Sequence, residues 1–199
     1  EYPSVKSALD YKTPLQLLVA VILSAQCTDA RVNIVTKDLF KKYLAVENFA
    51  SAPQEEFEKD IHSTGFYRNK AKNIIGACKM LISDFGGEVP DTMEELIKLP
   101  GVARKTANVI LHSAFGKEEG IAVDTHVIRL SGLIGLTKWK DPVKIEKDLI
   151  KITPQKDWGG FALTLTQHGR EVCVARRPNC SKCKINKICK SAFKVKGSF

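Results

Sequence analysis

The sequence predicts an all-α protein made of many short helices. Apolar residues recur three and four positions apart along most of the chain, and residues that favour helix ends punctuate them. No stretch sustains the alternation of apolar and polar residues that a half-buried strand requires. With 199 residues, 44% of them hydrophobic, the chain can form one large domain or two small ones and is too apolar to be disordered.

The first predicted helices are marked by their starts. Thr13-Pro14 suits a helix start with proline in the first turn, and it precedes an apolar run over residues 15–25. This run is too short to span a bilayer and contains polar residues, so we expect a buried helix. Thr28 offers the next N-cap, and residues 51–54 open a further helix.

A break in the helical pattern is expected over residues 65–69, before a long helix over residues 70–85. The predicted buried stripe of that helix is Ile74, Ala77, Cys78 and Leu81. Two glycines end it, and the spacing of Thr92 and Glu95 then predicts a capping box at the start of the next helix.

The net charge of +9 is concentrated at one end of the chain. Residues 170–199 carry nine Lys or Arg residues and one acidic residue, a net charge of +8. Such a segment is the electrostatic footprint of a nucleic-acid binder, although a solvated basic tail would have the same composition. We therefore expect a polyanionic partner.

Four cysteines, Cys173, Cys180, Cys183 and Cys189, follow the pattern C-x6-C-x2-C-x5-C. The uneven spacing suits the corners of a cubane iron–sulfur cluster, which four thiolates hold. A structural zinc site usually has two short knuckles and this segment has one, so zinc is the second possibility. Disulfides are the third, because they need an oxidising compartment to which nothing in the sequence points.

Residues 96–115 predict a helix, a tight turn and a second helix. Pro100 stops the first helix, and Gly101 permits the left-handed backbone that the turn needs. The second helix should start near Ala103, where the first-turn N–H groups have no partner inside the helix. These groups form a phosphate site made from backbone, which can hold a DNA strand without reading its sequence.

The sequence LPGVARKTANVIL at residues 99–111, followed by VDTH at residues 123–126, resembles the helix-hairpin-helix, Gly/Pro-Asp superfamily of DNA glycosylases. The cysteine quartet narrows the resemblance to the endonuclease III-like branch, over about residues 13–192. The hairpin alone is a weak signal, because such turns occur in many DNA-binding proteins. Hairpin, lysine, aspartate and cysteine quartet in this order are highly specific.

The resemblance implies that Lys105 is the catalytic nucleophile and Asp124 the essential carboxylate. Lys105 falls in the first turn of the predicted helix, where the dipole disfavours a charged ammonium and so favours a neutral amine. Asp124 can stabilise a cationic sugar as it forms. Taken alone, Lys105 reads as a solvated lysine and Asp124 as an ordinary N-cap, and it is the ordered combination that favours catalysis.

Two loops resemble the family's DNA-probing loops. Gln26, in residues 24–29, would fill the gap that the damaged nucleotide leaves, and Phe66, in residues 64–67, would wedge into the stack. The alternatives are an exposed polar residue at a helix end for Gln26 and a core residue for Phe66. The residues expected to bind DNA are Gln26, Phe66, Gly101, Val102, Ala103, Arg104, Arg176 and Arg177, the last two in the cluster loop.

One residue of the hairpin departs from the family pattern. Ala103 stands where a second glycine is usual. A backbone in an ordinary conformation tolerates alanine there, whereas a left-handed one would not. The geometry of the turn therefore decides whether the phosphate site survives this change.

The family's fold is two helical domains that flank a cleft. We expect a six-helix barrel over residues 15–118, with the hairpin at about residues 92–115. Residues 1–14 together with residues 119–199 would form the second domain, which carries the [4Fe–4S] cluster. The resemblance implies that Lys105 and Asp124 face each other across the cleft.

The function we expect is that of a bifunctional DNA glycosylase/AP lyase in base excision repair. It would remove oxidised pyrimidines and nick the strand 3′ to the abasic site by β-elimination. One alternative is a mismatch adenine glycosylase, but Ala20 stands where that branch has its catalytic glutamate. Another is a non-catalytic iron–sulfur protein that binds DNA or senses redox state.

The expected partner is double-stranded DNA with damaged bases or abasic sites, bound by a monomer away from any membrane. Residues 1–10 lack the cationic start and apolar stretch of a signal peptide. We expect the protein in the cytoplasm with the nucleoid if it is prokaryotic, and in the nucleus or mitochondrion if it is eukaryotic.

Overall fold

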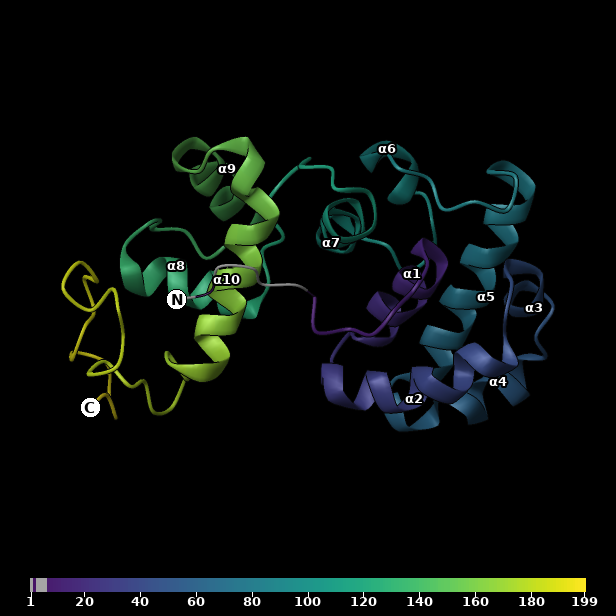
Figure 1. The fold of residues 1–199 in the computed structure, drawn as a ribbon, viewed down its shortest axis with the longest axis horizontal. Coiled ribbons are helices and arrows are strands. Elements are labelled where there is room, and N and C mark those ends of the chain that lie inside the picture. Colours follow the sequence, from purple (N-terminus) through teal and green to yellow (C-terminus); the bar gives the residue numbers. More distant parts are fainter. Residues whose placement is uncertain (1, 3–6) are drawn as a thin grey trace. The chain divides into compact units, whose positions relative to one another are not determined.

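The computed structural model describes Tyr2 and residues 7–199, and these residues form helices and turns with no strand (Figure 1). The all-α prediction is therefore confirmed. The helices are α1 (Pro14–Leu23), α2 (Asp29–Lys42), α3 (Val46–Ala50), α4 (Gln54–Ile61), η1 (His62–Thr64, a 3-10 helix), α5 (Tyr67–Asp84), α6 (Met93–Leu96), α7 (Arg104–Phe115), α8 (Thr125–Ile134), α9 (Pro142–Ile152), η2 (Gln155–Asp157, a 3-10 helix) and α10 (Trp158–Glu171).

The chain divides into two compact units. The first, Ser7–Lys117, contains α1 to α7, and the second contains Glu118–Phe199 together with Tyr2. Within the described residues, no helix is both long and apolar enough to cross a membrane.

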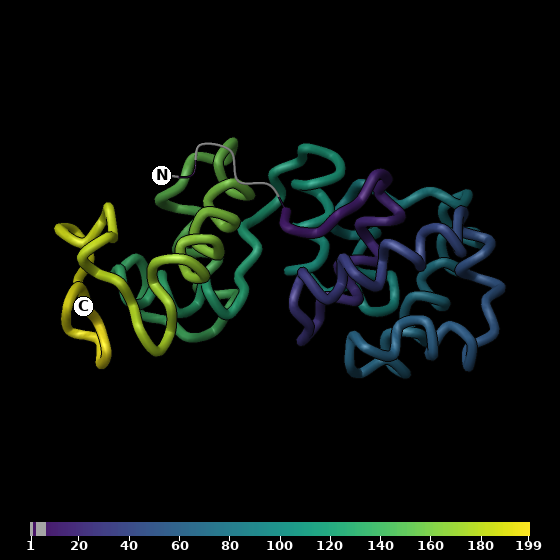
Figure 2. Tube along the Cα trace, turned by 60° about the horizontal axis from the view of Figure 1, so that its bottom comes forward, coloured from purple at the N-terminus to yellow at the C-terminus, as the bar shows by residue number. Residues whose placement is uncertain are grey.

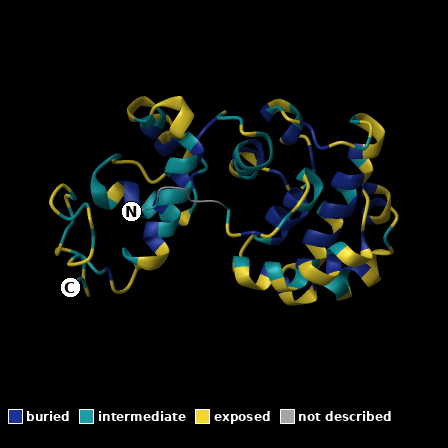
Figure 3. Cartoon of the chain, in the orientation of Figure 1, coloured by how far each residue is buried: buried dark blue, intermediate teal, exposed yellow. Residues whose placement is uncertain are grey.

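The core of the first unit is built around α1 and α5. Every residue from Leu17 to Leu23 is buried, and α1 packs against α2, α5 and α7. The predicted stripe of α5 is buried as expected, and α3 and α4 pack on this helix. Figure 3 shows mostly buried residues along α1, while the outer faces of α2 and α4 are exposed.

The predicted caps hold these helices in place. The Thr13 hydroxyl accepts a hydrogen bond from the Gln16 N–H, and the Thr28 hydroxyl accepts one from the Arg31 N–H. Thr92 accepts from the Glu95 N–H and donates to the Glu95 carboxylate, at 3.4 and 2.8 Å. Each cap satisfies a backbone donor that a helix start would leave unpaired.

The predicted break at residues 65–69 is too long. In the structure α5 begins at Tyr67, so that only Gly65 and Phe66 interrupt the helices. Both residues have left-handed backbones, with φ of 70° and 49°. Two such residues turn the chain sharply enough for the next helix to start at once.

The second unit has a smaller core and a long irregular end. Its eight fully packed apolar residues come from α8, α9, α10 and the segment before α8: Ile121, Val123, Val127, Leu130, Ile145, Leu149, Ala162 and Leu165. After α10, residues 172–199 form only turns, drawn in yellow in Figure 2. Helix packing therefore accounts for the first part of this unit and not for its end.

Candidate functional site

The hairpin turn has the backbone that its sequence predicts. Gly101 is left-handed, with φ of 81°, and a Cβ atom there would lie 2.9 Å from the Asn73 Cβ. Glycine is therefore required at this position both by conformation and by space. Val102 stabilises the turn, because its side chain is buried and its N–H donates to the Leu99 carbonyl.

Ala103 is the N-cap of α7 and has an extended backbone, with φ of −95° and ψ of 169°. Alanine adopts this conformation without strain, so the departure from the family's glycine leaves the turn intact. Its side chain cannot accept a hydrogen bond from the first turn of α7. Those N–H groups, together with the positive end of the helix dipole, favour an anion at this position.

Lys105 is the second residue of α7 and its side chain is exposed. The amine is therefore in contact with water in the protein without DNA. Exposure has its own consequence, because a bound sugar can reach the amine directly.

Asp124 is the N-cap of α8, as its sequence context predicts. Its Oδ1 accepts a hydrogen bond of 2.8 Å from the Val127 N–H, and its Oδ2 accepts one of 3.2 Å from the Thr166 hydroxyl of α10. The carboxylate is thus held at both oxygens. Sequence reasoning missed Thr166, because nothing local to it indicates a partner 42 positions away.

Gln26 and Phe66, the two predicted probing residues, share an unusual conformation. Both have left-handed backbones, with φ of 53° and 49°, although neither is glycine. Both side chains are exposed, and Phe66 exposes 62% of its surface, so that its reading as a core residue is wrong. Such backbones cost about 1–3 kcal/mol each, and they concentrate at functional sites.

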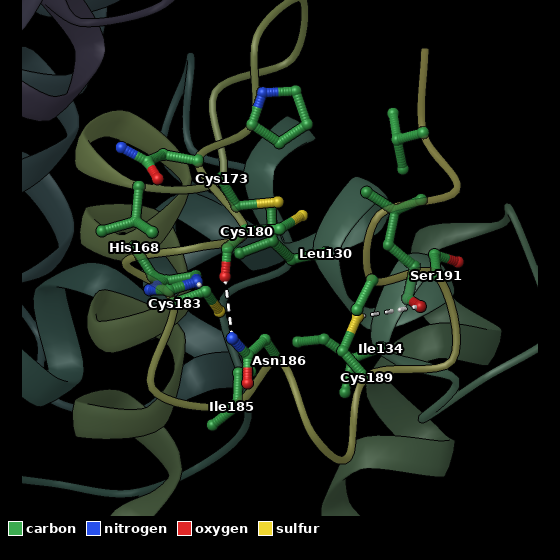
Figure 4. Close-up of a pocket in the computed structure, with 16 residues that line it drawn as sticks. Leu130, Ile134, His168, Cys173, Cys180, Cys183, Ile185, Asn186, Cys189 and Ser191 are labelled. Atoms are coloured by element: carbon green, nitrogen blue, oxygen red, sulfur yellow. Dashed lines mark hydrogen bonds between the residues drawn. The ribbon is translucent and has the colours of Figure 1, made fainter. Parts of the chain in front are cut away.

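The four cysteines of the second unit surround one pocket (Figure 4). All four are free thiols, and the other lining residues are largely apolar. Backbone and side-chain groups approach the sulfur atoms. The Phe193 N–H donates to the Cys180 Sγ over 3.4 Å, and the Arg129 guanidinium donates to the Cys173 Sγ over 3.6 Å. Hydrogen bonds of this kind tune the ligands of metal centres.

The four cysteines line one pocket, as the ligands of a cluster held by four thiolates would. Among the described residues, no three His, Cys, Asp or Glu side chains lie close enough together to hold a metal ion, so the case for a cluster rests on the cysteine spacing and the shared pocket. Cysteines spaced around a shared volume match a cubane, whose four irons each take one thiolate.

The electrostatics of the pocket oppose ionisation of Cys183 when no cation is bound. Burial raises the pKa of the Cys183 thiol, and the other three cysteines add to this rise. Four thiolates crowded together repel one another, so that a group of positive charge is needed to hold all four ionised.

The predicted DNA-binding arginines lie on the loop between the first two cysteines. Arg176 and Arg177 are exposed, and the Arg177 guanidinium stacks over the Phe199 ring at 5.4 Å from its centroid. The loop is closed by a turn in which the Arg177 N–H donates to the Val174 carbonyl. The turn and the ring contact restrain Arg177 at the protein surface.

Comparison with known proteins identifies the class to which these features belong. A family model described as "HhH-GPD superfamily base excision DNA repair protein" matches residues 19–155. The chain belongs to this superfamily.

Its curated relatives narrow the class. Endonuclease III of a Synechocystis strain is 57% identical over 96% of this chain and 87% of its own length. Endonuclease III of Bacillus subtilis is 49% identical over 97% and 88%. The predicted membership of the endonuclease III-like branch is therefore confirmed.

Solved structures agree. A trapped endonuclease III–DNA covalent intermediate, an estranged-adenine complex, is similar with a TM-score of 0.93 and 47% identity, over 97% of this chain and 91% of that one. A thermostable thymine-DNA glycosylase has a TM-score of 0.82 and 26% identity, over 93% and 87%. The chain is a DNA-binding glycosylase of base excision repair with AP lyase activity.

Proposed function

We propose that this enzyme removes oxidised pyrimidines from duplex DNA, as a monomer, and nicks the strand 3′ to the resulting abasic site. The observation that carries the proposal is the exposed amine of Lys105, directly after a hairpin turn suited to a phosphate. The similarity to a trapped covalent complex with DNA supports a protein nucleophile.

In the proposed reaction the damaged nucleotide is first flipped out of the duplex. The neutral amine of Lys105 attacks the sugar C1′, and an N–C1′ bond forms as the bond to the base breaks. The base leaves with the electron pair and takes up a proton. Ring opening gives a Schiff base, and loss of a proton from C2′ then expels the 3′ phosphate. Asp124 stabilises the cationic sugar and accepts the proton that the amine releases.

We assign the nucleophile and the probing residues to the first unit, which we interpret as the barrel domain. Gln26 would occupy the place of the flipped nucleotide, and Phe66 would separate the neighbouring bases. The hairpin from Gly101 to Arg104 would hold the backbone close to Lys105. Lys105 lies in the first unit and Asp124 in the second, so the proposed reaction needs DNA to contact residues of both units.

We assign the second unit to a [4Fe–4S] cluster held by Cys173, Cys180, Cys183 and Cys189. When bound, the cluster would cross-link the chain end and fix the loop that carries Arg176 and Arg177. Cleavage of a glycosidic bond transfers no electrons, so the proposed role of the cluster is structural. We place the enzyme with the cell's DNA: at the nucleoid of a prokaryote, or in the nucleus or mitochondrion of a eukaryote.

A panel of duplexes, each with one lesion, tests the substrate class. The panel should contain thymine glycol, an oxidised cytosine, a G·T mismatch, adenine opposite oxidised guanine, and undamaged DNA. We expect base release and strand nicking on the oxidised pyrimidines. Preferred release of thymine from G·T, or of adenine, would overturn this substrate assignment and favour a mismatch glycosylase.

A further inference from the structure

Lys70 is the one lysine that is buried among the described residues, with 4% of its surface exposed. It lies in the first turns of α5. Its ammonium donates hydrogen bonds of 2.8 Å to the Leu23 carbonyl and of 2.8 Å to the Thr64 carbonyl. Burial lowers the pKa of Lys70, and nearby Cys27 opposes that shift. Burying a charged ammonium costs free energy unless hydrogen bonds compensate for it, so we asked what the two bonds of Lys70 achieve.

The two carbonyls mark the ends of two different helices. Leu23 is the last residue of α1 and Thr64 is the last residue of η1. The C-terminus of α1 also presents the negative end of its helix dipole to the ammonium. Lys70 therefore links two chain segments whose bonded carbonyls are 41 positions apart in the sequence.

The chain leaves each of these carbonyls towards a strained, exposed residue. Gln26 follows Leu23 by three positions, and Phe66 follows Thr64 by two. These are the two left-handed residues other than glycine within the first unit. Such backbones persist only where the surroundings determine them strongly, and the Lys70 ammonium fixes the start of both loops.

We propose that Lys70 is a positioning residue that holds Gln26 and Phe66 at a fixed separation, so that both enter the DNA stack together. The inference rests on the proposed roles of these two side chains. If each loop moved independently, one residue could insert without the other. The base would then be expelled less often, because the gap and the wedge would not form at the same time.

The effect of Lys70 should differ between the two steps of the enzyme. Release of an intact damaged base requires the stack to be opened, whereas a preformed abasic site has no base to expel. A general loss of folded protein would lower both activities by the same factor. The ratio of base release to lyase activity, measured in single turnovers, therefore separates positioning from stability.

Lys70→Met keeps the long side chain and removes the ammonium. We expect base release from a thymine-glycol duplex to fall by about tenfold to a hundredfold, the loss typical of a misplacement of roughly 1 Å. Lyase activity on an abasic duplex should fall by less than about threefold, since no base needs expulsion. Amide hydrogen exchange should quicken at residues 25–27 and 65–67. Lys79→Met, an exposed lysine on the same helix, is the matched control and should change neither activity.

Lys70→Gln replaces Lys70→Met if the latter does not fold, since its amide keeps two N–H donors without the charge. Equal losses in both activities, or unchanged base release in a folded variant, would overturn the positioning role. Gln26→Ala and Phe66→Ala test the proposed roles of these two side chains separately. If neither variant lowers base release, the proposed roles of Gln26 and Phe66 are wrong, and so is the positioning role of Lys70. If both variants lower base release while Lys70→Met does not, only the positioning role of Lys70 is overturned.

Discussion

The first unit buries seven consecutive residues of α1, Leu17 to Leu23, whereas residues 172–199 of the second unit bury a single residue, Pro178. The first unit can thus be stabilised by apolar burial, at about 25 cal/mol per Å². The chain end is not stabilised in this way, because its apolar side chains, such as Ile188 and Phe193, are largely exposed. What it offers instead is four cysteines around one pocket. Helix packing thus holds the unit that carries the proposed nucleophile, and we propose that metal ligation holds the proposed DNA-binding loop.

Among the changes that test this difference between the two regions, loss of one cluster ligand should have the largest effect. Cys183→Ser should lower the iron content from about four atoms per chain towards none, since the cluster needs all four thiolates. Residues 172–199 should become sensitive to protease while Ser7–Lys117 stays resistant. Iron analysis and limited proteolysis with mass spectrometry measure both. Cys78→Ser, at a buried cysteine of the first unit, is the control and should retain the iron. One zinc and no iron in the wild type would contradict the cluster assignment.

The reverse experiment removes burial from the first unit. Phe57 is fully buried and its ring meets the Tyr43 ring edge-on at 5.2 Å. Phe57→Ala should cost about 3–5 kcal/mol of unfolding free energy, as large cavities in cores do. Denaturant unfolding measures the loss, and the iron content of the folded fraction should be unchanged. Phe66→Ala, at an exposed phenylalanine, should change stability by less than about 0.5 kcal/mol. Similar losses from the two variants would mean that Phe66 is packed.

Features of the fold and of the candidate site could be predicted from the sequence where they depend on residues close together in the chain. The caps at Thr13, Thr28 and Asp124 act over three positions, and the sequence predicts each of them. The bonds from Lys70 to Leu23 and from Thr166 to Asp124 span 47 and 42 positions. No local pattern encodes such pairs, because the fold brings the partners together.

Removing the arginines of the cluster loop should have a moderate effect. Arg176→Ala with Arg177→Ala should weaken binding to damaged and undamaged duplexes by similar factors, because phosphate contacts carry no sequence information. The slope of log affinity against log salt should become shallower by about 0.9 for each phosphate that the loop no longer neutralises. Affinity titrations at several salt concentrations measure this. Lys79→Ala, at an exposed lysine of the first unit, should leave the slope unchanged. A loss of lesion preference with an unchanged slope would mean that the loop reads the substrate.

The smallest effect is expected at Thr166. Thr166→Val removes the donor to the Asp124 Oδ2 and leaves the N-cap bond to Oδ1 in place. A single hydrogen bond is worth roughly 1 kcal/mol, so base release should slow by about fivefold with KM unchanged. Thr164→Val, on the same helix, is the control. A change in KM alone would indicate that Thr166 contacts the substrate and does not orient the carboxylate.

We propose that the two units share the chemistry, with the nucleophile at Lys105 and the carboxylate at Asp124. Borohydride added during the reaction tests it most directly, because it reduces a Schiff base to a stable protein–DNA crosslink. The wild type should crosslink to an abasic duplex. Lys105→Gln should bind that duplex and form no crosslink, whereas Lys98→Gln, at an exposed lysine before the hairpin turn, should still form one. Undiminished crosslinking by Lys105→Gln would place the nucleophile elsewhere and contradict this account.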